Sequence, residues 1–529
     1  MSEQEKAQDE TMRAKLEAVE QARLAASDAG RPEAVARQRK RGKMTARERI
    51  ASLFDAGSFV EMGGLVQPMR ERADAERLVA PADGLVTGTG RIDGRPVAIC
   101  ASDYTALGGS IGHVGRQKML RLMRRAGDAG MPFVMLHDGG GHRIQDGQDA
   151  RSFSQGTPVF DLFAQLSGWV PIVSAVMGPA FAGPTNYSAM ADFVVMVRGQ
   201  SAMGMAGPAL VKAAIGEDID IEALGGASMH VDTSGIAHLA TADEASCLQA
   251  VRDYLSYMPS NAGQPAPLGP TGDPAERCEE ALLDVVPTNL RKGYDVRKVL
   301  NLVADRGSVF EMRPTFARNI VVCFARLGGR PVGMIANQPS VMAGMIDVPS
   351  SEKAAQFIAV CDAFGLPLIY FIDVPGNAIG SAAEKAGLGR RSGRMLFELG
   401  CSTVPRLSVV LRRGYGGAFI MMNGGQPSFG SEASFIWPSA EICAMSVEGS
   451  VDVAYRNDYA NAPDPQARRR ELIDNIRKHL GPLRAAEHFH IDDVIDPRRT
   501  RPMLIRALQD APARRQGQRY PKHRTISPI

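Results

Sequence analysis

Four glycine-rich turns are the segments of this chain whose composition and spacing could do chemistry. Residues 138–143 and 373–377 follow apolar runs, and residues 178–183 and 414–418 lead into predicted helices. Glycine lets the backbone approach a ligand closely and adopt unusual dihedral angles. N–H groups from two such turns can converge on one oxygen atom and stabilise the negative charge that develops there. The turns therefore predict two oxyanion-binding sites, although any one cluster alone could be a tight structural turn.

The turns recur because the chain contains an internal repeat. The sequence Arg91-Ile92-Asp93-Gly94-Arg95-Pro96-Val97 returns 235 residues later as Arg326-Leu327-Gly328-Gly329-Arg330-Pro331-Val332. An offset of 234 relates Gly183 to Gly417. Identical pairs at the first offset are Gly109 and Gly344, Lys118 and Lys353, Pro132 and Pro367, Asp138 and Asp373, and Gly141 and Gly376. The period is too long for a solenoid, whose repeats span about 20–50 residues. We therefore expect two copies of one domain.

Both copies show apolar runs that alternate with helix-forming segments. This pattern is typical of parallel strands covered on both faces, and it predicts an α/β fold. Ligands of such sheets bind beside the carboxyl ends of the strands, where the glycine turns lie. We expect strands at residues 84–88, 96–101, 132–137, 172–177, 331–336, 367–372 and 407–411, and helices at 111–126, 158–168, 350–363 and within 463–512.

Length and composition are those of a globular protein with two domains. A chain of 529 residues is too long for one core, and a Pro- and Gly-rich stretch separates the two copies. We expect an N-terminal domain at residues 1–258, a linker at 259–285 and a C-terminal domain at 286–529. No run of eighteen apolar residues occurs, and the first residues lack a signal peptide's apolar core. We therefore expect a cytoplasmic protein without membrane association.

Cysteines and charges exclude some classes of partner. The seven cysteines lack CxxC spacing, which is typical of reduced thiols and predicts no metal site. No basic stripe is interleaved with aromatic residues, so nucleic acid is not an expected partner. Residues 36–49 are nevertheless basic and include Arg41 and Lys43. These cations either form solvated surface or a subunit contact, or they bind the phosphates of a multiply phosphorylated ligand.

Six stretches of the sequence resemble one enzyme family, the carboxyltransferase (β) subunits of biotin-dependent acyl-CoA carboxylases. That family includes the propionyl-CoA, acetyl-CoA and methylcrotonyl-CoA enzymes. The similar stretches span nearly the whole chain and are specific only as a set. They are Arg41-Gly42-Lys43-Met44-Thr45-Ala46-Arg47-Glu48-Arg49-Ile50, Gly207-Pro208-Ala209-Leu210-Val211-Lys212, Leu224-Gly225-Gly226-Ala227, Ala336-Asn337-Gln338-Pro339, Gly414-Tyr415-Gly416-Gly417-Ala418 and Trp437-Pro438-Ser439-Ala440-Glu441-Ile442.

The resemblance implies a fold and a set of partners. Both domains would have the ClpP/crotonase-like fold, with the acyl-CoA on the N-terminal domain and carboxybiotin on the C-terminal domain of a partner subunit. The biotin-attachment sequence Met-Lys-Met and the P-loop motif occur nowhere in the chain. A separate biotin carboxylase and biotin carboxyl carrier subunit would therefore bring the biotin. The family also suggests a hexamer, arranged as a trimer of dimers.

The resemblance further implies roles for individual residues. Ala182 and Gly183, with the turn that contains Gly141 and His142, would hold the thioester oxygen. Gly417 and Ala418, with Gly376 and Asn377, would hold the ureido oxygen of biotin. Carboxybiotin would release CO2, the resulting biotin anion would remove the acyl α-proton, and the enolate would attack CO2. Predicted ligand contacts are Arg41 and Lys43 for CoA phosphates, and Asn337 and Ile420.

Three positions depart from the family's pattern. His142 replaces an alanine, Pro184 removes one backbone donor, and Asn377 replaces a frequent phenylalanine. His142 either lines the pocket, donates to the thioester oxygen or contacts a polar acyl group, so the acyl group stays open. The reverse reaction, in a decarboxylase or transcarboxylase, would use the same site. A crotonase-type hydratase is an alternative enzyme, but it would need carboxylates near the turns. The non-enzyme alternative is a CoA-binding assembly subunit without activity.

Overall fold

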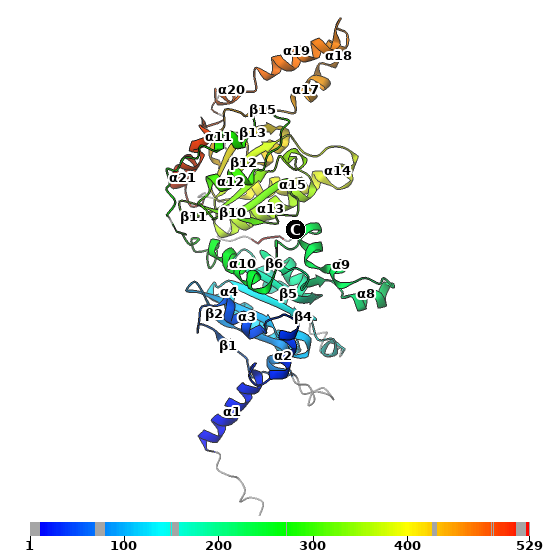
Figure 1. Ribbon diagram of the computed structural model, residues 1–529, viewed down its shortest axis with the longest axis vertical. Coiled ribbons are helices and arrows are strands. Elements are labelled where there is room, and N and C mark those ends of the chain that lie inside the picture. The colour runs from blue at the N-terminus through cyan, green and yellow to red at the C-terminus, as the bar shows by residue number, and fades with distance from the viewer. Residues whose placement is uncertain are drawn as a thin grey trace, which may run out of the picture. The chain divides into compact units, whose positions relative to one another are not determined.

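The computed structural model describes residues 11–68, 80–148, 150, 158–270, 272–425, 431–487, 489, 491–514 and 525–527. The chain divides into two compact units, residues 1–253 and 254–529, and each unit is built around its own sheet (Figure 1). The domain limits and the linker predicted above stay a prediction. In the described ranges, every helix is too short or too polar to cross a membrane.

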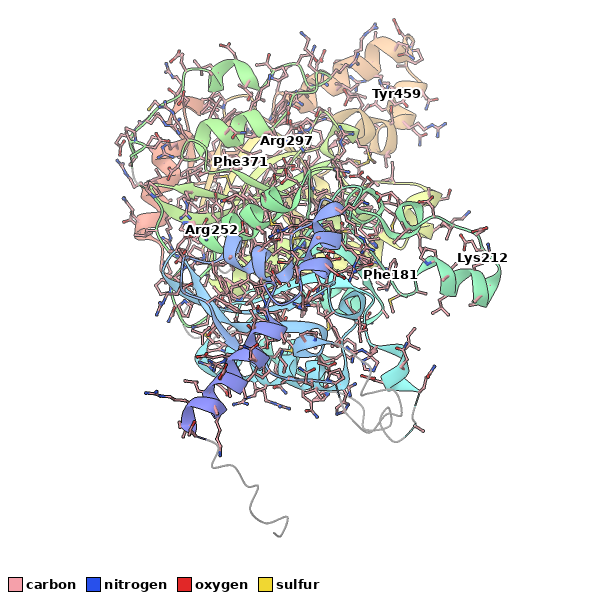
Figure 2. The ribbon with its side chains drawn as sticks, turned by 60° about the horizontal axis from the view of Figure 1, so that its bottom comes forward. Phe181, Lys212, Arg252, Arg297, Phe371 and Tyr459 are labelled. Carbon is pink, nitrogen blue, oxygen red and sulfur yellow. The ribbon has the colours of Figure 1, made fainter. Side chains whose placement is uncertain are left out.

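The first unit contains an eight-stranded sheet with the order β1-β2-β3-β4-β5-β6-β8, and β7 pairs with β5. Helices cover the sheet, and α8 and α9 project from it; Figure 2 marks Lys212 on α8. The strands are β1 Val60–Met62, β2 Leu85–Ile92, β3 Arg95–Ser102, β4 Phe133–Gly139, β5 Ile172–Phe181, β6 Phe193–Val197, β7 Ala202–Gly204 and β8 Leu239–Thr241. The helices are α1 Met12–Ala26, α2 Pro32–Lys40, α3 Ala46–Leu53, α4 His113–Ala129, α6 Val159–Leu166, α7 Gly183–Ala189, α8 Pro208–Ile215, α9 Ile221–Gly225 and α10 Glu244–Tyr257, whose last turn belongs to the second unit.

The second unit contains an eight-stranded sheet with the order β16-β14-β13-β12-β11-β10-β9, and β15 pairs with β13. Its strands are β9 Phe310–Met312, β10 Ile320–Leu327, β11 Arg330–Asn337, β12 Leu368–Val374, β13 Arg406–Tyr415, β14 Ser431–Ile436, β15 Glu441–Cys443 and β16 Asp493–Val494. Its helices are α11 Leu282–Val285, α12 Arg297–Val303, α13 Val348–Phe364, α14 Ser381–Lys385, α15 Leu388–Cys401, α16 Gly416–Met421, α17 Val447–Ala454, α18 Arg456–Ala460, α19 Pro465–Arg477, α20 Pro482–Ala486 and α21 Thr500–Asp510.

The two sheets have the same strand order, with β9 to β14, β15 and β16 in the places of β1 to β6, β7 and β8. The register also repeats, because Phe133 pairs with Ile172 and Leu368 pairs with Arg406. Both pairings shift near the strand ends, between His137 and Gly139 and between Ile372 and Val374. The predicted tandem duplication of an α/β domain is therefore confirmed.

The strands are not all parallel, contrary to the expectation from their apolar runs. β2 and β3 form an antiparallel hairpin, as do β10 and β11. The cause lies in the two-residue turns, where Asp93 and Gly94 have φ of 49° and 77°. Such positive φ values at both central positions give the turn type that matches the twist of a hairpin. The remaining pairs from β3 to β8 are parallel, as predicted.

A lysine, partly buried in the first unit and fully buried in the second, supports the start of the first long strand. The Nζ of Lys118 donates to the carbonyl oxygens of Ala82 and Leu85 at 3.1 and 2.6 Å. Lys353, 235 residues later, donates to four carbonyl oxygens, including that of Ile320 at 2.8 Å. A buried ammonium group is tolerated only when it is hydrogen-bonded. The repeat has thus preserved a structural contact as well as the turns.

Candidate active site

The two glycine turns of the first unit meet at the carboxyl ends of β4 and β5. Gly139 pairs with Ala180, which places the turn after β4 next to the end of β5. A Cβ atom built on Gly141 would lie 2.6 Å from the carbonyl oxygen of Phe181 and 3.7 Å from Cδ of Pro184. Figure 2 marks Phe181, which ends β5. The structure therefore brings together the two turns that the sequence assigned to one site.

Two backbone N–H groups of the first unit are available as donors. Ile111 forms a parallel bridge with His142, in which Ile111 donates to Gly141 and receives a bond from Arg143. The N–H of His142 lies between these two bonds and points away from Ile111. Gly183 is the first residue of α7, and the first N–H groups of a helix have no acceptor within it. His142 and Gly183 thus form a donor pair of the kind that holds an oxyanion.

Ala182 contributes to this site through its backbone conformation and not as a donor. Its N–H donates to the carbonyl oxygen of Gly204 at 2.8 Å, so it is already bonded. Its φ of 60° turns the chain sharply from β5 into α7. That Ala182 and Gly183 hold the thioester oxygen stays a prediction, and β7 already accepts the N–H of Ala182. Pro184 has no N–H, so Gly183 is the donor of this turn.

The second unit repeats the arrangement. Val374 pairs with Gly414, and Ile346 forms a parallel bridge with Asn377. Ile346 donates to Gly376 at 3.1 Å and receives a bond from Ala378 at 2.7 Å, which leaves the N–H of Asn377 pointing away.

In this unit Gly417 and Ala418 lie in the first turn of α16, where N–H groups have no helical acceptor. Apart from its chain neighbours and the backbone of its own helix, no described atom lies within 4 Å of a Cβ built on Gly417, so its surroundings are open. All four predicted residues of this site (Gly376, Asn377, Gly417 and Ala418) lie in these two turns.

A buried aspartate fixes the first turn in each unit, a role that the sequence pattern did not reveal. Asp138 accepts hydrogen bonds from Lys43 Nζ at 2.9 Å, Arg49 Nη2 at 2.8 Å and Gln38 at 3.1 Å. Its counterpart Asp373 accepts bonds from Nε of the neighbouring arginines of β13, at 2.9 Å from Arg412 and 2.7 Å from Arg413. The repeat shows that both equivalent positions carry an aspartate, which was a signal of this role. Their partners could not be found in this way, because they come from distant positions in the chain.

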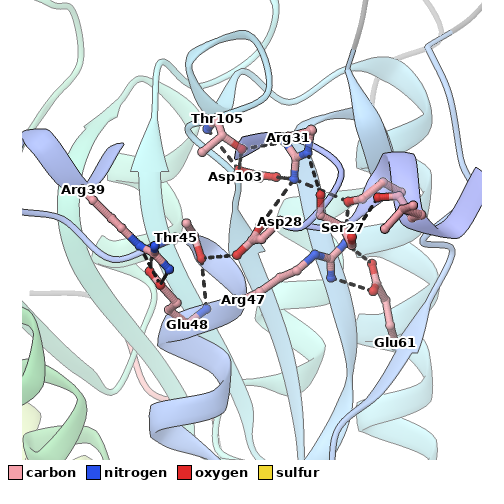
Figure 3. Close-up of polar contacts among 12 residues, drawn as sticks. Ser27, Asp28, Arg31, Arg39, Thr45, Arg47, Glu48, Glu61, Asp103 and Thr105 are labelled. Atoms are coloured by element: carbon pink, nitrogen blue, oxygen red, sulfur yellow. Dashed lines mark hydrogen bonds and ion pairs between the residues drawn. The ribbon is translucent and has the colours of Figure 1, made fainter. Parts of the chain in front are cut away.

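The basic segment at residues 36–49 is mostly occupied by internal ion pairs. Arg47 pairs with Glu61 at 2.6 Å, and Arg39 pairs with Glu48 (Figure 3). Lys43 is 10% exposed and pairs with Asp138. Arg41 is exposed, with its guanidinium 4.9 Å from the ring centre of Tyr104. Phosphate binding by Arg41 and Lys43 stays a prediction, and the exposure favours Arg41.

The other two predicted ligand contacts differ in exposure. Asn337 is fully buried; its Nδ2 donates to the carbonyl of Gly344, and its Oδ1 accepts from the N–H of Asp373. Asn337 therefore braces the turn that begins at Asp373. Ile420, on α16, is 59% exposed and could contact a bound molecule. Direct ligand contacts by these two residues stay predictions.

A buried histidine near the first turn should make the first unit acid-sensitive. Burial lowers the pKa of His137 to about 4, and no described residue bonds its Nε2. The unfolded chain, with a pKa near 6.5, binds more protons between these values, so stability falls as pH decreases below about 6.5. At about pH 5 this amounts to a loss of about 2 kcal/mol.

We expect the His137→Ile variant to lack this pH-dependent loss of stability. Isoleucine is the residue at the equivalent position of the second unit, Ile372. Urea denaturation of both proteins at about pH 5 and about pH 7.5 measures it. An equal change with pH in the two proteins would show that His137 is not its source.

Comparison with known proteins gives the family. Residues 37–526 match the model of the carboxyl transferase domain. The chain belongs to the carboxyl transferase family. It is 40% identical to the propionyl-CoA carboxylase carboxyltransferase subunit of Haloferax mediterranei over 98% of this chain and 99% of that protein. It is 37% identical to the methylmalonyl-CoA decarboxylase subunit alpha of Veillonella parvula over 98% of this chain and 99% of that protein.

A solved structure of the family is similar over the whole chain. The crystal structure of transcarboxylase 12S, a hexamer with methylmalonyl-coenzyme A bound, is 37% identical, covers 98% of both chains and gives a TM-score of 0.92. The predicted family, the crotonase-like fold in both domains and the assignment to the carboxyltransferase enzymes are confirmed. The individual site residues stay predictions.

Proposed function

We propose that this chain is the carboxyltransferase subunit of a biotin-dependent acyl-CoA carboxylase. It moves a carboxyl group between carboxybiotin, carried by a separate subunit, and the α-carbon (or vinylogous carbon) of an acyl-CoA. The observation that carries the proposal is the presence of a donor pair at the same place in both units: His142 and Gly183, and Asn377 and Gly417. Two substrates whose reacting groups both develop charge on a carbonyl oxygen need two such pairs.

The chain's contribution to the reaction is placement and charge stabilisation. In the first unit, the N–H groups of His142 and Gly183 hold the thioester oxygen and stabilise it as the α-carbon becomes an enolate. In the second unit, the N–H groups of Asn377 and Gly417 hold the ureido oxygen. Carboxybiotin would supply the CO2 and the base that removes the α-proton. Fixed donors of this kind need no reorganisation during the reaction, and holding both substrates in place adds to the rate.

The surrounding assembly follows from the same relatives. We propose that the chain forms a homo-hexamer, as described for transcarboxylase 12S, and binds a biotin carboxylase and biotin carboxyl carrier subunit. In this assembly the first unit of one subunit works with the second unit of a partner subunit. The seven cysteines, which all lie in described ranges, form no disulfide, which fits a reducing, cytoplasmic location.

The direction of transfer depends on the partners. Relatives of similar identity are named as a carboxylase subunit, a decarboxylase subunit and a methylmalonyl-CoA carboxyltransferase. Because the same bonds form and break in either direction, one site serves all three. Pro184 does not indicate an inactive subunit, since Gly183 retains the N–H at the start of α7.

The direct assay uses the full-length chain without its partners. Carboxyl-labelled malonyl-CoA, methylmalonyl-CoA and ethylmalonyl-CoA are each incubated with free biotin, and label in carboxybiotin is measured. We expect transfer that requires both the chain and biotin. Binding of the CoA thioesters without any transfer to biotin would favour the assembly subunit that lacks activity.

A further inference from the structure

A group of basic side chains lies beside the donor pair of the first unit. The bridge between Ile111 and His142 places His142 next to the start of α4, which begins at His113. One turn further along α4, Nη2 of Arg116 lies 3.2 Å from Nδ1 of His113. His113, Arg116 and His142 therefore belong to one cluster, which we call the basic cluster. None of its side chains was assigned to the reaction above.

Arg116 carries a charge that no described carboxylate neutralises by direct contact. The nearby carboxylates are already engaged by Arg143, which lies 2.6 Å from Asp83 and 3.5 Å from Asp146. Asp146 also accepts the backbone N–H of His113 at 3.2 Å. Within the described ranges, Arg116 has no ion-pair partner within 4 Å, although its side chain is partly buried. A partly buried guanidinium without a carboxylate is a suitable partner for an anion from outside the chain.

Tyr187 and His142, which lie at the donor pair, are both affected by the charge of Arg116. A Cβ built on Gly183 would lie 3.2 Å from the hydroxyl oxygen of Tyr187, so this hydroxyl borders the donor turn. The Tyr187 ring stacks on Phe163 in the core, with the ring centres 5.1 Å apart. Burial raises the pKa of Tyr187 to about 12, and the charge of Arg116 opposes this increase. Burial and the same charge lower the pKa of His142, and the charge of Asp146 opposes this decrease.

The second unit provides an internal comparison. At the equivalent positions of the repeat, His113, Arg116 and His142 are replaced by Val348, Ser351 and Asn377, none of which is charged. Ser351 instead donates to the carbonyl oxygen of Asp347 inside the buried helix α13. The fold therefore does not require basic residues at these places. The basic cluster is confined to the unit that we propose for the acyl group.

We propose that the first unit selects acyl-CoA thioesters whose acyl chain ends in a carboxylate. Arg116 is the cationic partner of this carboxylate, and the side chains of His142 and Tyr187 donate hydrogen bonds to it. The proposal rests on the proposed function, because it assumes that the thioester oxygen lies at His142 and Gly183. Tyr187 is packed against the core and so forms the inner wall of the site. The end of the acyl chain contacts Tyr187, whereas the carboxyl group that is transferred enters from the side of the site opposite Tyr187.

The test is equilibrium binding of pairs of thioesters to the full-length chain. Glutaryl-CoA and succinyl-CoA are compared with pentanoyl-CoA and butyryl-CoA, which have acyl chains of the same length without the carboxylate. We expect the wild type to bind the carboxylate-bearing member of each pair more tightly. The Arg116→Gln variant should lose roughly 10- to 100-fold of affinity for these members, as expected for a hydrogen bond to a charged group, and should bind the neutral members unchanged.

Two further variants test whether the basic cluster binds the carboxylate of the acyl chain or only maintains the structure of the site. Arg124→Gln removes an exposed charge from the same helix and should change neither affinity. His142→Ala keeps the backbone N–H and should weaken only the carboxylate-bearing thioesters. The proposal is wrong if the wild type does not distinguish the pairs, or if Arg116→Gln weakens all thioesters equally. Methylmalonyl-CoA is measured alongside the pairs. The proposal is also wrong if Arg116→Gln weakens binding of methylmalonyl-CoA but not of glutaryl-CoA or succinyl-CoA, since Arg116 would then contact the transferred carboxyl group. Absence of binding by every CoA thioester would instead contradict the proposed function.

Discussion

The Gly417→Pro variant should lose roughly 10²–10³-fold in kcat for carboxyl transfer, which corresponds to about 2.7–4 kcal/mol for one lost oxyanion donor. Proline removes the N–H of Gly417 in the first turn of α16, where helices tolerate proline. The first unit is untouched by the change, so affinity for acyl-CoA should stay near that of the wild type. The rate is measured with free biotin as the acceptor, and circular dichroism checks the fold.

Gly417→Ala is the matched control for this prediction. It keeps the N–H, and the added Cβ has no described atom within 4 Å beyond its chain neighbours and its own helix backbone. We expect its kcat to stay close to that of the wild type. A folded Gly417→Pro protein with full activity would remove the turn from the biotin site. Loss of acyl-CoA binding in that variant would mean that the two half-sites are assigned the wrong way round.

The Asp373→Ala variant should destabilise the second unit by about 3–5 kcal/mol, the usual result of removing one partner of a buried ion pair. Asp373 is fully buried and bonded to Arg412 and Arg413, which are 1% and 9% exposed. Its removal leaves two buried guanidinium groups without their carboxylate. The turn that carries Asn377 begins at this residue, so carboxyl transfer should fall as well. Denaturation followed by a probe in the second unit measures the loss.

The same substitution at an exposed ion pair controls for the effect of alanine. Asp452 pairs with Arg469 at 2.7 Å, with side chains 43% and 27% exposed. Exposed pairs of this kind contribute little to stability. We expect Asp452→Ala to leave the stability of the unit close to that of the wild type. Similar losses in the two variants would show that burial of Asp373 adds nothing.

The repeat made much of the fold predictable from the sequence. Residues related by the offsets of 235 and 234 occupy the same places in the strand pairing of the two units. A change in loop length between the strands alters the offset but not the pairing. The bounds of β4, β5, β12 and β13 lie close to the predicted strands, since continuous apolar runs mark strands buried on both faces. The hairpins at residues 92–95 and 327–330 were missed because their turn residues were not weighed against the apolar pattern. The strand β16 is two residues long and too short to give a pattern.

The site was predicted less completely than the fold. Glycine positions marked the turns, but the sequence does not show which N–H groups are free. Ala182 was predicted to help hold the thioester oxygen, and its N–H is bonded to Gly204 of β7, twenty-two residues later. Asp138 and Lys43 are 95 residues apart in the chain and meet as an ion pair at 2.9 Å. Such contacts depend on tertiary structure, which periodicity and composition do not encode.

The most direct test of the account is activity in mixed assemblies of two inactive variants. Gly183→Pro removes the donor of the first unit, and Gly417→Pro removes the donor of the second. If each active site combines the first unit of one subunit with the second unit of a partner, a mixed pair contains one intact site. Coexpression in equal amounts should then restore about a quarter of wild-type carboxyl transfer, as random pairing about a two-fold axis requires. Mixed assemblies as inactive as either variant alone would contradict the account.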